Sequence, residues 1–386
     1  MPLLSSLPRQ KATYSDFCNY LICFFKGTNM HDYRLAEGKK LLKKNDLTYL
    51  LISDPISVRY ISGFIASNVF LLLKSRSNTL FTDFRYKDVA NKFCKLSEKW
   101  KFVQINGSGL SFLGRYIRSG SNIGIQSDKL TIDQLDSLKK VVKNCKIKKI
   151  GNNLSEIFSI KSKKEINSIR RAAFIADRTY SEIVKNIKPG MTEKSIANQL
   201  DLLKFQYGSE KSAFDTIVLF GSRTALVHGI PSNRKLKNGD FILFDFGCVV
   251  DGFCSDMTRT IIFGKANKRQ KQIYDIVKKA QENAKGSVHP GLKISSIDDK
   301  ARSIITGAGY GDSFGHTTGH GIGLQVHEFP SVYHTCKALI SENMVFTIEP
   351  GIYLSGFGGV RIEDTIYVTK KGLRSLTQSP RDLQII

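Results

Sequence analysis

The chain has 386 residues, which is enough for about two domains and for a sizeable buried core without disulfide bonds. Hydrophobic residues make up 41% of it and charged residues 24%, as in soluble globular proteins, and no apolar run reaches the length of a membrane span, so no membrane contact is expected. The formal net charge of +24 is spread over both halves without a basic and aromatic motif, so we interpret it as compositional bias and do not expect nucleic-acid binding.

The N-terminal third is predicted to alternate helices with strands. Residues 1–29 lack the cleavage pattern of a signal peptide, and we interpret them as a leader of unknown role. The alternation predicts an α/β domain over residues 30–153. The Lys-rich residues 139–149 and the Gly-Asn-Asn that follows indicate its boundary with a second domain, residues 154–386. The predicted elements are helices over residues 34–44 and 83–96 and strands over residues 47–52, 69–73, 79–82 and 123–125.

The second domain is predicted to contain an internal repeat. A helix over residues 164–187 ends at a Lys-Pro-Gly turn, and a His-Pro-Gly turn at residues 289–291 follows about a hundred residues later. The apolar segment around Asp245 is matched, at about the same offset, by the apolar segment that leads to Glu349. We therefore expect two similar units that face each other in an α+β arrangement, and chance similarity of the turns is the alternative.

Each copy of the repeat supplies two carboxylates in or beside apolar, β-rich segments. The first copy supplies Asp245 and Asp256, and the second supplies Glu349 and Glu363. A buried carboxylate needs a cation or a proton to offset its desolvation. Four carboxylates that converge on one point would repel one another strongly, so the pattern predicts a divalent metal ion among them.

Histidines gather in the same half of the chain. Three of the seven, His316, His320 and His327, lie within the Gly-rich residues 314–328. The glycines argue against a helix there, so His316 and His320 need not share a face although they are four residues apart. Oxygen ligands with one imidazole suit Mn²⁺, Co²⁺ or Zn²⁺. We interpret the stretch as a source of a metal ligand, in preference to a purely structural role.

These motifs resemble those of the pita-bread metallopeptidases, the family that includes prolidase, aminopeptidase P and methionine aminopeptidase. The resemblance covers the chain from about residue 161 to the C-terminus. Residues 54–64 also resemble a motif of the N-terminal domain of prolidases and aminopeptidases P, which minimal methionine aminopeptidases lack. The resemblance implies a creatinase-like α/β N-terminal domain followed by a pita-bread catalytic domain with a pseudo-twofold repeat. It is carried by residues 245–260, 319–323, 347–353 and 359–365.

The resemblance implies a set of ligands for two divalent metal ions, with Mn²⁺ preferred to Co²⁺ or Zn²⁺. By this resemblance, Asp245 chelates one ion and His320 binds the other. Asp256 and Glu363 bridge the two ions. Glu349 completes the ligand set and passes a proton to the leaving nitrogen. In the family picture the two ions activate a hydroxide that attacks the scissile carbonyl.

The resemblance also implies residues that handle the substrate. His228 and His327 would hold it or stabilise the tetrahedral intermediate, and His316 would line the same cleft. Arg361 would orient the ligand carboxylates. Phe214 matches a position that packs on the proline ring in relatives, and plain core packing is an equal alternative.

The expected function is a metal-dependent exopeptidase that hydrolyses Xaa-Pro bonds in short peptides, either as a dipeptidase or as an aminopeptidase. A homodimer is the family expectation. The alternatives are a methionine-aminopeptidase-like activity and a non-catalytic pita-bread binding protein, and the presence of all five ligands disfavours the latter. The odd number of scattered cysteines predicts reduced thiols and a cytoplasmic location. Cys248 and Cys254 are expected to be buried fillers rather than ligands.

Overall fold

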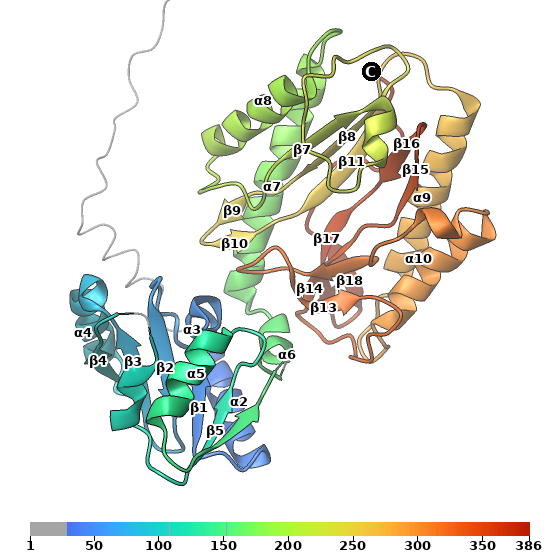
Figure 1. Ribbon diagram of the computed structural model, residues 1–386. Helices are drawn as coiled ribbons and strands as arrows, with labels where there is room; N and C mark the ends of the chain where they lie inside the picture. The colour runs from blue at the N-terminus through green and yellow to red at the C-terminus, as the bar shows by residue number, and fades with distance from the viewer. Residues whose placement is uncertain (1–28, 108, 152) are drawn as a thin grey trace, which may run out of the picture. The chain divides into compact units, whose positions relative to one another are not determined.

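The computed structural model describes residues 29–107, 109–151 and 153–386, and the chain divides between Ile157 and Phe158 into two compact units (Figure 1). The division falls four residues beyond the predicted boundary at residue 153. The predicted leader, apart from Asn29, lies outside the described residues. No helix in the described part of the chain is both long enough and apolar enough to cross a membrane.

The first unit is built on a six-stranded mixed sheet whose strand order is β4-β3-β2-β1-β5-β6. Its central strands are fully buried, and they form the core together with Leu110, Leu113 and Leu138 from the surrounding segments. The strands are β1 (Tyr49–Ile52), β2 (Val69–Leu73), β3 (Asn78–Thr82), β4 (Trp100–Gln104), β5 (Asn122–Ile125) and β6 (Lys146–Lys149). The helices are α2 (Asn29–Lys44), α3 (Pro55–Ser62), η1 (Phe84–Tyr86), α4 (Lys87–Leu96), η2 (Ser111–Arg115), α5 (Ile132–Val141) and α6 (Asn153–Ser159), the last of which spans the division.

The Lys-rich residues 139–149, which together with the Gly-Asn-Asn after them predicted the boundary, lie within the first unit, and the division follows after Ile157. Their first lysines end α5, and their last residues form β6, which pairs in parallel with β5 at the edge of the sheet. Lysines are common on edge strands because their charge discourages pairing with another chain. Sequence patterns also missed α3, although Asp54 caps it by accepting from the backbone N–H of Ser57 and Pro55 starts it.

The second unit repeats one arrangement of elements (Figure 1). In each half, two helices are followed by a long antiparallel hairpin into which a shorter hairpin is inserted. In the first half the long hairpin is β8–β11 and the inserted one is β9–β10; in the second half they are β14–β17 and β15–β16. The first half contains α7 (Lys163–Asn186), α8 (Glu193–Gln206), β7 (Ile217–Phe220), η3 (Gly221–Ala225), β8 (Phe241–Phe246), β9 (Val249–Val250), β10 (Phe253–Cys254) and β11 (Met257–Ile262). The second half contains α9 (Lys268–Gly286), α10 (Ser295–Gly307), η4 (Gly311–Ser313), β12 (Gly319–Gly321), β13 (Glu328–Val332), β14 (Val345–Ile348), β15 (Gly351–Leu354), β16 (Gly358–Arg361), β17 (Asp364–Thr369) and β18 (Gly372–Ser375). The structure therefore shows the predicted pseudo-twofold repeat.

Each half of the second unit has its own core. Helices α7 and α8 pack on the three-stranded sheet β11-β8-β7, and α9 and α10 pack on the strands of the five-stranded sheet β13-β12-β14-β17-β18. In Figure 1 the strands of this unit lie between the two helix pairs. The predicted helix over residues 164–187 is α7, which starts at a capping box formed by Ser162 and Glu165 and buries one apolar stripe. Each of the two long hairpins therefore belongs to a sheet that is packed against a pair of helices.

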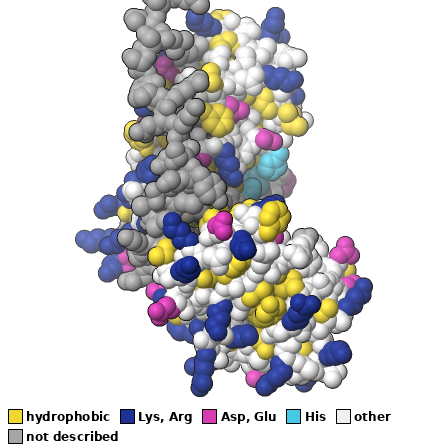
Figure 2. Space-filling model, turned by 90° about the vertical axis from the view of Figure 1, so that its left-hand side faces the viewer, with side chains coloured by type: hydrophobic (Ala, Val, Ile, Leu, Met, Phe, Trp, Pro, Cys, Tyr) yellow, Lys and Arg dark blue, Asp and Glu magenta, His cyan; other side chains and the backbone are white. Residues whose placement is uncertain are grey.

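The positive charge has no single focus on the visible surface. Figure 2 shows one face of the molecule, on which Lys and Arg side chains are scattered among acidic and uncharged ones. This distribution agrees with the interpretation of the net charge of +24 as a compositional bias.

Candidate metal centre and substrate site

The two long hairpins bring the four predicted carboxylates to corresponding places. Asp245 lies near the end of β8, and Asp256 immediately precedes β11. Glu349 follows the last residue of β14, and Glu363 immediately precedes β17. Thr258 is the cross-strand partner of Asp245. Carboxylates at the same ends of two related hairpins converge because the hairpins are related by the repeat.

Three of the predicted ligands form a compact cluster. One ligand atom each from Asp256, His320 and Glu363 lies within 4.8 Å of the others. The Nε2 atom of His320 lies 3.6 Å from Oδ2 of Asp256 and 3.2 Å from Oε1 of Glu349. These distances place four of the five predicted ligands around one point. The fifth, Asp245, is connected to the group through Arg361, whose Nη2 donates to its Oδ2 at 2.6 Å.

Two oxygens of this cluster are buried acceptors without a donor. Within the described part of the chain, Oδ1 of Asp256 and Oε1 of Glu363 have no hydrogen-bond partner, and both residues are at most 5% exposed. Buried polar atoms are almost always satisfied, because leaving one without a partner is costly. Oxygens and one imidazole that face a common point are the donor set of a hard or borderline divalent cation. The residues present therefore fit a metal ion.

The ionisation of the cluster agrees with this fit. Burial, together with the charges of neighbouring carboxylates, raises the pKa of both Asp256 and Glu363 well above the ordinary range. Burial opposes ionisation of His320 and Glu349 as well, but their mutual hydrogen bond and attraction raise the pKa of His320 to about 9 and lower that of Glu349 to about 2. A divalent cation would favour the ionised form of every carboxylate here.

The glycines around His320 let the strands come close to the ligand. A Cβ atom on Gly319 would lie 1.9 Å from the carbonyl oxygen of Thr347, so no other residue fits there. The Nδ1 atom of His320 lies 3.1 Å from the carbonyl oxygen of Gly321, which as a donor contact would leave Nε2 free to act as a ligand. Thr347 donates to Glu349 Oε1 at 3.0 Å and accepts from the backbone N–H of His320. One threonine therefore joins the two ligand-bearing segments.

Arg361 is a buried hub behind the carboxylates. Its guanidinium donates to Oδ2 of Asp245, to Oγ1 of Thr258 at 2.9 Å and to the hydroxyl of Tyr353 at 2.9 Å. Thr258 in turn donates to Oε2 of Glu363 at 2.7 Å. Arg361 therefore contacts Asp245 directly and Glu363 through Thr258, and its role in orienting these carboxylates stays a prediction.

The sequence did not single out Thr258, Thr347 or Tyr353. The available signal was their position inside the ligand motifs, since Thr258 lies two residues after Asp256 and Tyr353 lies four after Glu349. Their contacts could not be inferred, because most of their partners lie on other strands. Tyr353 is an example, because its hydroxyl forms hydrogen bonds with both Arg361 and His316.

His316 lies beside the cluster as the partner of Tyr353. Its Nε2 is 2.9 Å from the Tyr353 hydroxyl, and its Nδ1 is 2.7 Å from the carbonyl oxygen of Thr317. Burial lowers the pKa of His316, although the charge of Glu349 opposes this. Burial also raises the pKa of Tyr353 to about 12. A neutral His316 with a proton on Nδ1 therefore accepts from Tyr353, which accepts from Arg361.

The remaining predicted residues, Phe214, His228 and His327, are not buried. The ring of His327 lies 4.3 Å, centroid to centroid, from that of His320, and partial burial with the charges of His320 and His228 lowers the pKa of His327. His228 and His327 are both exposed to solvent. Phe214 is partly buried, and its Cε1 would be 3.1 Å from a Cβ atom on Gly247, two residues beyond Asp245. The ring of Phe214 and the imidazole of His327 therefore lie close to predicted ligands, and the charge of His228 acts on His327.

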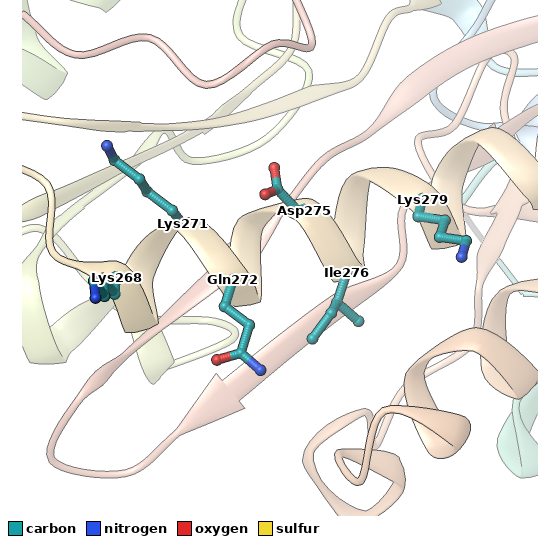
Figure 3. Close-up of a pocket in the computed structure, with 6 residues that line it drawn as sticks. All are labelled: Lys268, Lys271, Gln272, Asp275, Ile276 and Lys279. Atoms are coloured by element: carbon teal, nitrogen blue, oxygen red, sulfur yellow. The ribbon is translucent and has the colours of Figure 1, made fainter.

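A different hollow lies along the exposed face of α9 (Figure 3). Half of its lining side chains are lysines, and all of them come from this one helix. None of the predicted ligands or substrate residues lines it. The hollow is therefore separate from the carboxylate and histidine cluster. Its lining residues are Lys268, Lys271, Gln272, Asp275, Ile276 and Lys279.

The chain is similar to known proteins over most of its length. Residues 167–370 match the model of metallopeptidase family M24, and residues 34–157 match that of the creatinase/prolidase N-terminal domain. A protein named Xaa-Pro dipeptidase from Pyrococcus horikoshii is 38% identical over 355 residues, which are 89% of this chain and 96% of that protein.

Solved structures give the same picture. An Xaa-Pro dipeptidase from Bacillus anthracis has a TM-score of 0.86 and 33% identity, over 92% of this chain and 100% of that one. An X-Pro aminopeptidase from Thermotoga maritima has a TM-score of 0.77 and 32% identity, over 88% of this chain and 98% of that one. The chain belongs to metallopeptidase family M24, carries a creatinase/prolidase N-terminal domain, and is a metallopeptidase.

Proposed function

We propose that this protein is a metal-dependent exopeptidase that hydrolyses Xaa-Pro bonds, with dipeptides as its preferred substrates. The observation that carries the proposal is the pair of buried, unpartnered oxygens on Asp256 and Glu363 beside Nε2 of His320. Relatives that share the fold over nearly the whole chain are named Xaa-Pro dipeptidase, and one solved neighbour is named X-Pro aminopeptidase. Preference for dipeptides follows the more similar of these relatives.

Two divalent cations, with Mn²⁺ preferred, are proposed to be held by Asp245, Asp256, His320, Glu349 and Glu363. Bound there, they would supply Lewis-acid polarisation of the peptide carbonyl and activation of water at neutral pH. Arg361 balances the charge of Asp245, and the other three carboxylates carry more charge than one divalent ion can balance, which supports a second cation.

The protein's own groups have distinct proposed roles. Glu349 would take a proton from the attacking water and give it to the leaving proline nitrogen, because its carboxylate lies 3.2 Å from Nε2 of His320 inside the cluster. Arg361 would keep Asp245 in place. His228 and His327 would bind the substrate's polar groups, and the ring of Phe214 would pack against proline.

Hydrolysis of defined peptides tests the proposal. Protein loaded with Mn²⁺ is expected to cleave Ala-Pro, to cleave Ala-Pro-Ala less efficiently, and to leave Met-Ala intact. The Asp256→Asn variant should lose both the activity and Mn²⁺ binding measured by calorimetry. Absence of turnover of every Xaa-Pro peptide by metal-loaded protein would contradict the proposal. Cleavage of Met-Ala would indicate a methionine-aminopeptidase-like enzyme instead.

We also propose that the protein acts in the cytoplasm as a homodimer. The absence of disulfides at Cys94, Cys145, Cys248 and Cys336 supports a reducing compartment. Light scattering on the purified protein tests the dimer, and a monomer at micromolar concentration would contradict it.

A further inference from the structure

Glu193 is a fully buried carboxylate outside the metal cluster. It is the first residue of α8 and is 0% exposed. Its Oε1 accepts from the backbone N–H of Phe220 at 2.8 Å, and its Oε2 accepts from the backbone N–H and the hydroxyl of Ser232 at 2.8 Å and 2.6 Å. The Nε of Arg223 donates to both oxygens, at 3.1 Å and 3.0 Å. One carboxylate thus holds both ends of residues 220–232.

Residues 220–232 form a loop, here called the His228 loop, with an exposed histidine near its tip. Arg223 crosses the loop, and its Nη2 donates to the carbonyl oxygen of Ile230 at 2.7 Å. A turn closes next to the histidine, because the N–H of Gly229 donates to the carbonyl oxygen of Leu226 at 3.0 Å. The Glu193–Arg223 pair therefore fixes the backbone on both sides of His228.

The opposite side of the His228 loop rests on the metal-centre hairpins. The hydroxyl of Thr224 donates to Gly221 and accepts from the backbone N–H of Gly359, both at 2.7 Å. Gly359 belongs to β16, the strand that ends at Arg361. The charge of His228 also influences the pKa of His327, whose ring contacts that of His320. The loop therefore lies between Glu193 and the strands that carry the site.

A similar arrangement occurs in the second half of the unit. Asp298 on α10 is 0% exposed and forms a two-point ion pair with Arg302. Arg302 donates to the carbonyl oxygens of Phe314 and His316 at 2.8 Å and 3.0 Å, and Thr318 donates to Asp298 at 2.7 Å. In each half, a buried carboxylate on the second helix and an arginine hold a segment that carries a histidine. Repetition of the arrangement argues against an incidental ion pair.

A purely stabilising ion pair would not need this geometry. Charge-assisted hydrogen bonds are strong and directional, and the five that four donor groups make to the Glu193 carboxylate leave little freedom to the backbone that supplies them. A loop that is already rigid in its binding conformation loses little freedom when the substrate binds, so loosening it weakens binding. Holding the loop rigid therefore matters most at His228.

We propose that Glu193 is a positioning residue for substrate binding, which through Arg223 and Ser232 holds the His228 loop in its binding conformation. The proposal rests on the proposed function in so far as His228 binds the substrate. It assigns no contact between Glu193 and the substrate. Its expected signature is weaker substrate binding with unchanged metal binding.

The Ser232→Ala variant tests the proposal with a matched control. Ser379→Ala removes the same kind of bond elsewhere, because the Ser379 hydroxyl donates to Asp177 at 2.6 Å, the length of the Ser232 bond to Glu193. Both variants should lower the melting temperature slightly. Only Ser232→Ala should raise the KM for Ala-Pro, by about tenfold, with kcat and the Kd for Mn²⁺ within about twofold of wild type.

Rescue and exchange measurements complete the test. Ser232→Thr keeps the hydroxyl and should restore the KM, whereas Glu193→Gln should raise it further. Deuterium exchange should accelerate in residues 224–230 in Ser232→Ala and Glu193→Gln but not in Ser379→Ala. Unchanged exchange in these residues, or an equal KM in the two alanine variants, would overturn the proposal. If the wild type does not cleave Ala-Pro, the proposed function fails, and the exchange data alone decide whether Glu193 holds the loop.

Discussion

Replacement of Thr258 by valine tests how the protein positions its metal ligands. Thr258 is 0% exposed, and its hydroxyl joins two charged groups, donating to Oε2 of Glu363 at 2.7 Å and accepting from Nε of Arg361 at 2.9 Å. Valine has a similar shape but cannot form either bond. The change therefore leaves a buried carboxylate oxygen and a buried guanidinium N–H without their partner.

The size of the effect follows from these contacts. A hydrogen bond to a charged group contributes about 1.5–3 kcal/mol. Arg361 keeps its bonds to Asp245 and Tyr353, so the loss should fall mainly on Glu363. We expect a loss of about 1.5–3 kcal/mol in the free energy of unfolding, the range for one such bond, because Arg361 keeps its other partners. The affinity for Mn²⁺ should fall about 10–100-fold, as for other groups that orient metal ligands.

Calorimetric titration with Mn²⁺ and urea unfolding measure the two effects. Thr260→Val is the matched control, because the Thr260 hydroxyl is equally buried on the same strand but bonds only to the backbone N–H and carbonyl of Arg361, at 3.1 Å and 3.0 Å. It should lose stability and keep its Mn²⁺ affinity. Thr258→Ser retains the hydroxyl and should bind Mn²⁺ nearly as the wild type does. Wild-type Mn²⁺ affinity in Thr258→Val would refute the reasoning.

Two further predictions concern buried titratable groups. Burial raises the pKa of Tyr353 to about 12, so the stability that its protonated hydroxyl contributes is present below pH 10 and is lost as the pH rises from about 10 to about 12, at about 1.4 kcal/mol per pH unit. In urea unfolding, the free energy of unfolding of Tyr353→Phe should fall less steeply with rising alkaline pH than that of the wild type. Equal slopes of this free energy against pH would contradict the prediction. Burial raises the pKa of Cys248 to about 12, so at pH 8 roughly one Cys248 thiol in ten thousand is ionised. Mass spectrometry after brief iodoacetamide treatment should find Cys248 unmodified in native protein and modified in urea. If Cys248 in native protein were labelled as fast as the partly exposed Cys145, the prediction would be contradicted.

Local sequence patterns were enough wherever a structure depends on neighbours in the chain. The apolar stripe of residues 164–187 predicted α7 because a helix repeats every 3.6 residues, and the Lys-Pro-Gly turn after it marked its end. The recurrence of turns and acidic motifs predicted the two-fold repeat. The same reasoning was less exact at residues 139–149, where a run of lysines was interpreted as part of a domain boundary and is the end of a helix and an edge strand within the first unit, which continues to Ile157.

The candidate site, too, was predicted in part from the sequence and in part only seen in the folded structure. A metal ion among Asp245, Asp256, Glu349 and Glu363 was predicted from the sequence because a carboxylate in an apolar segment needs a cation or a proton, and the resemblance to the family implied their ligand roles. The convergence of three of them beside His320, and the two oxygens left without donors among the described residues, required the folded hairpins.

Tertiary structure alone decided which side chains hold the site in place. Thr258 and Glu363 are 105 residues apart, Arg361 and Asp245 are 116 apart, and Glu193 meets Ser232 across 39. The sequence does not indicate which distant atom a given hydroxyl or guanidinium will form a hydrogen bond with. The sequence by itself determined the kinds of groups and the elements that carry them, because propensity and periodicity are local; the folded chain decided their partners, because hydrogen bonds depend on distances that only packing sets.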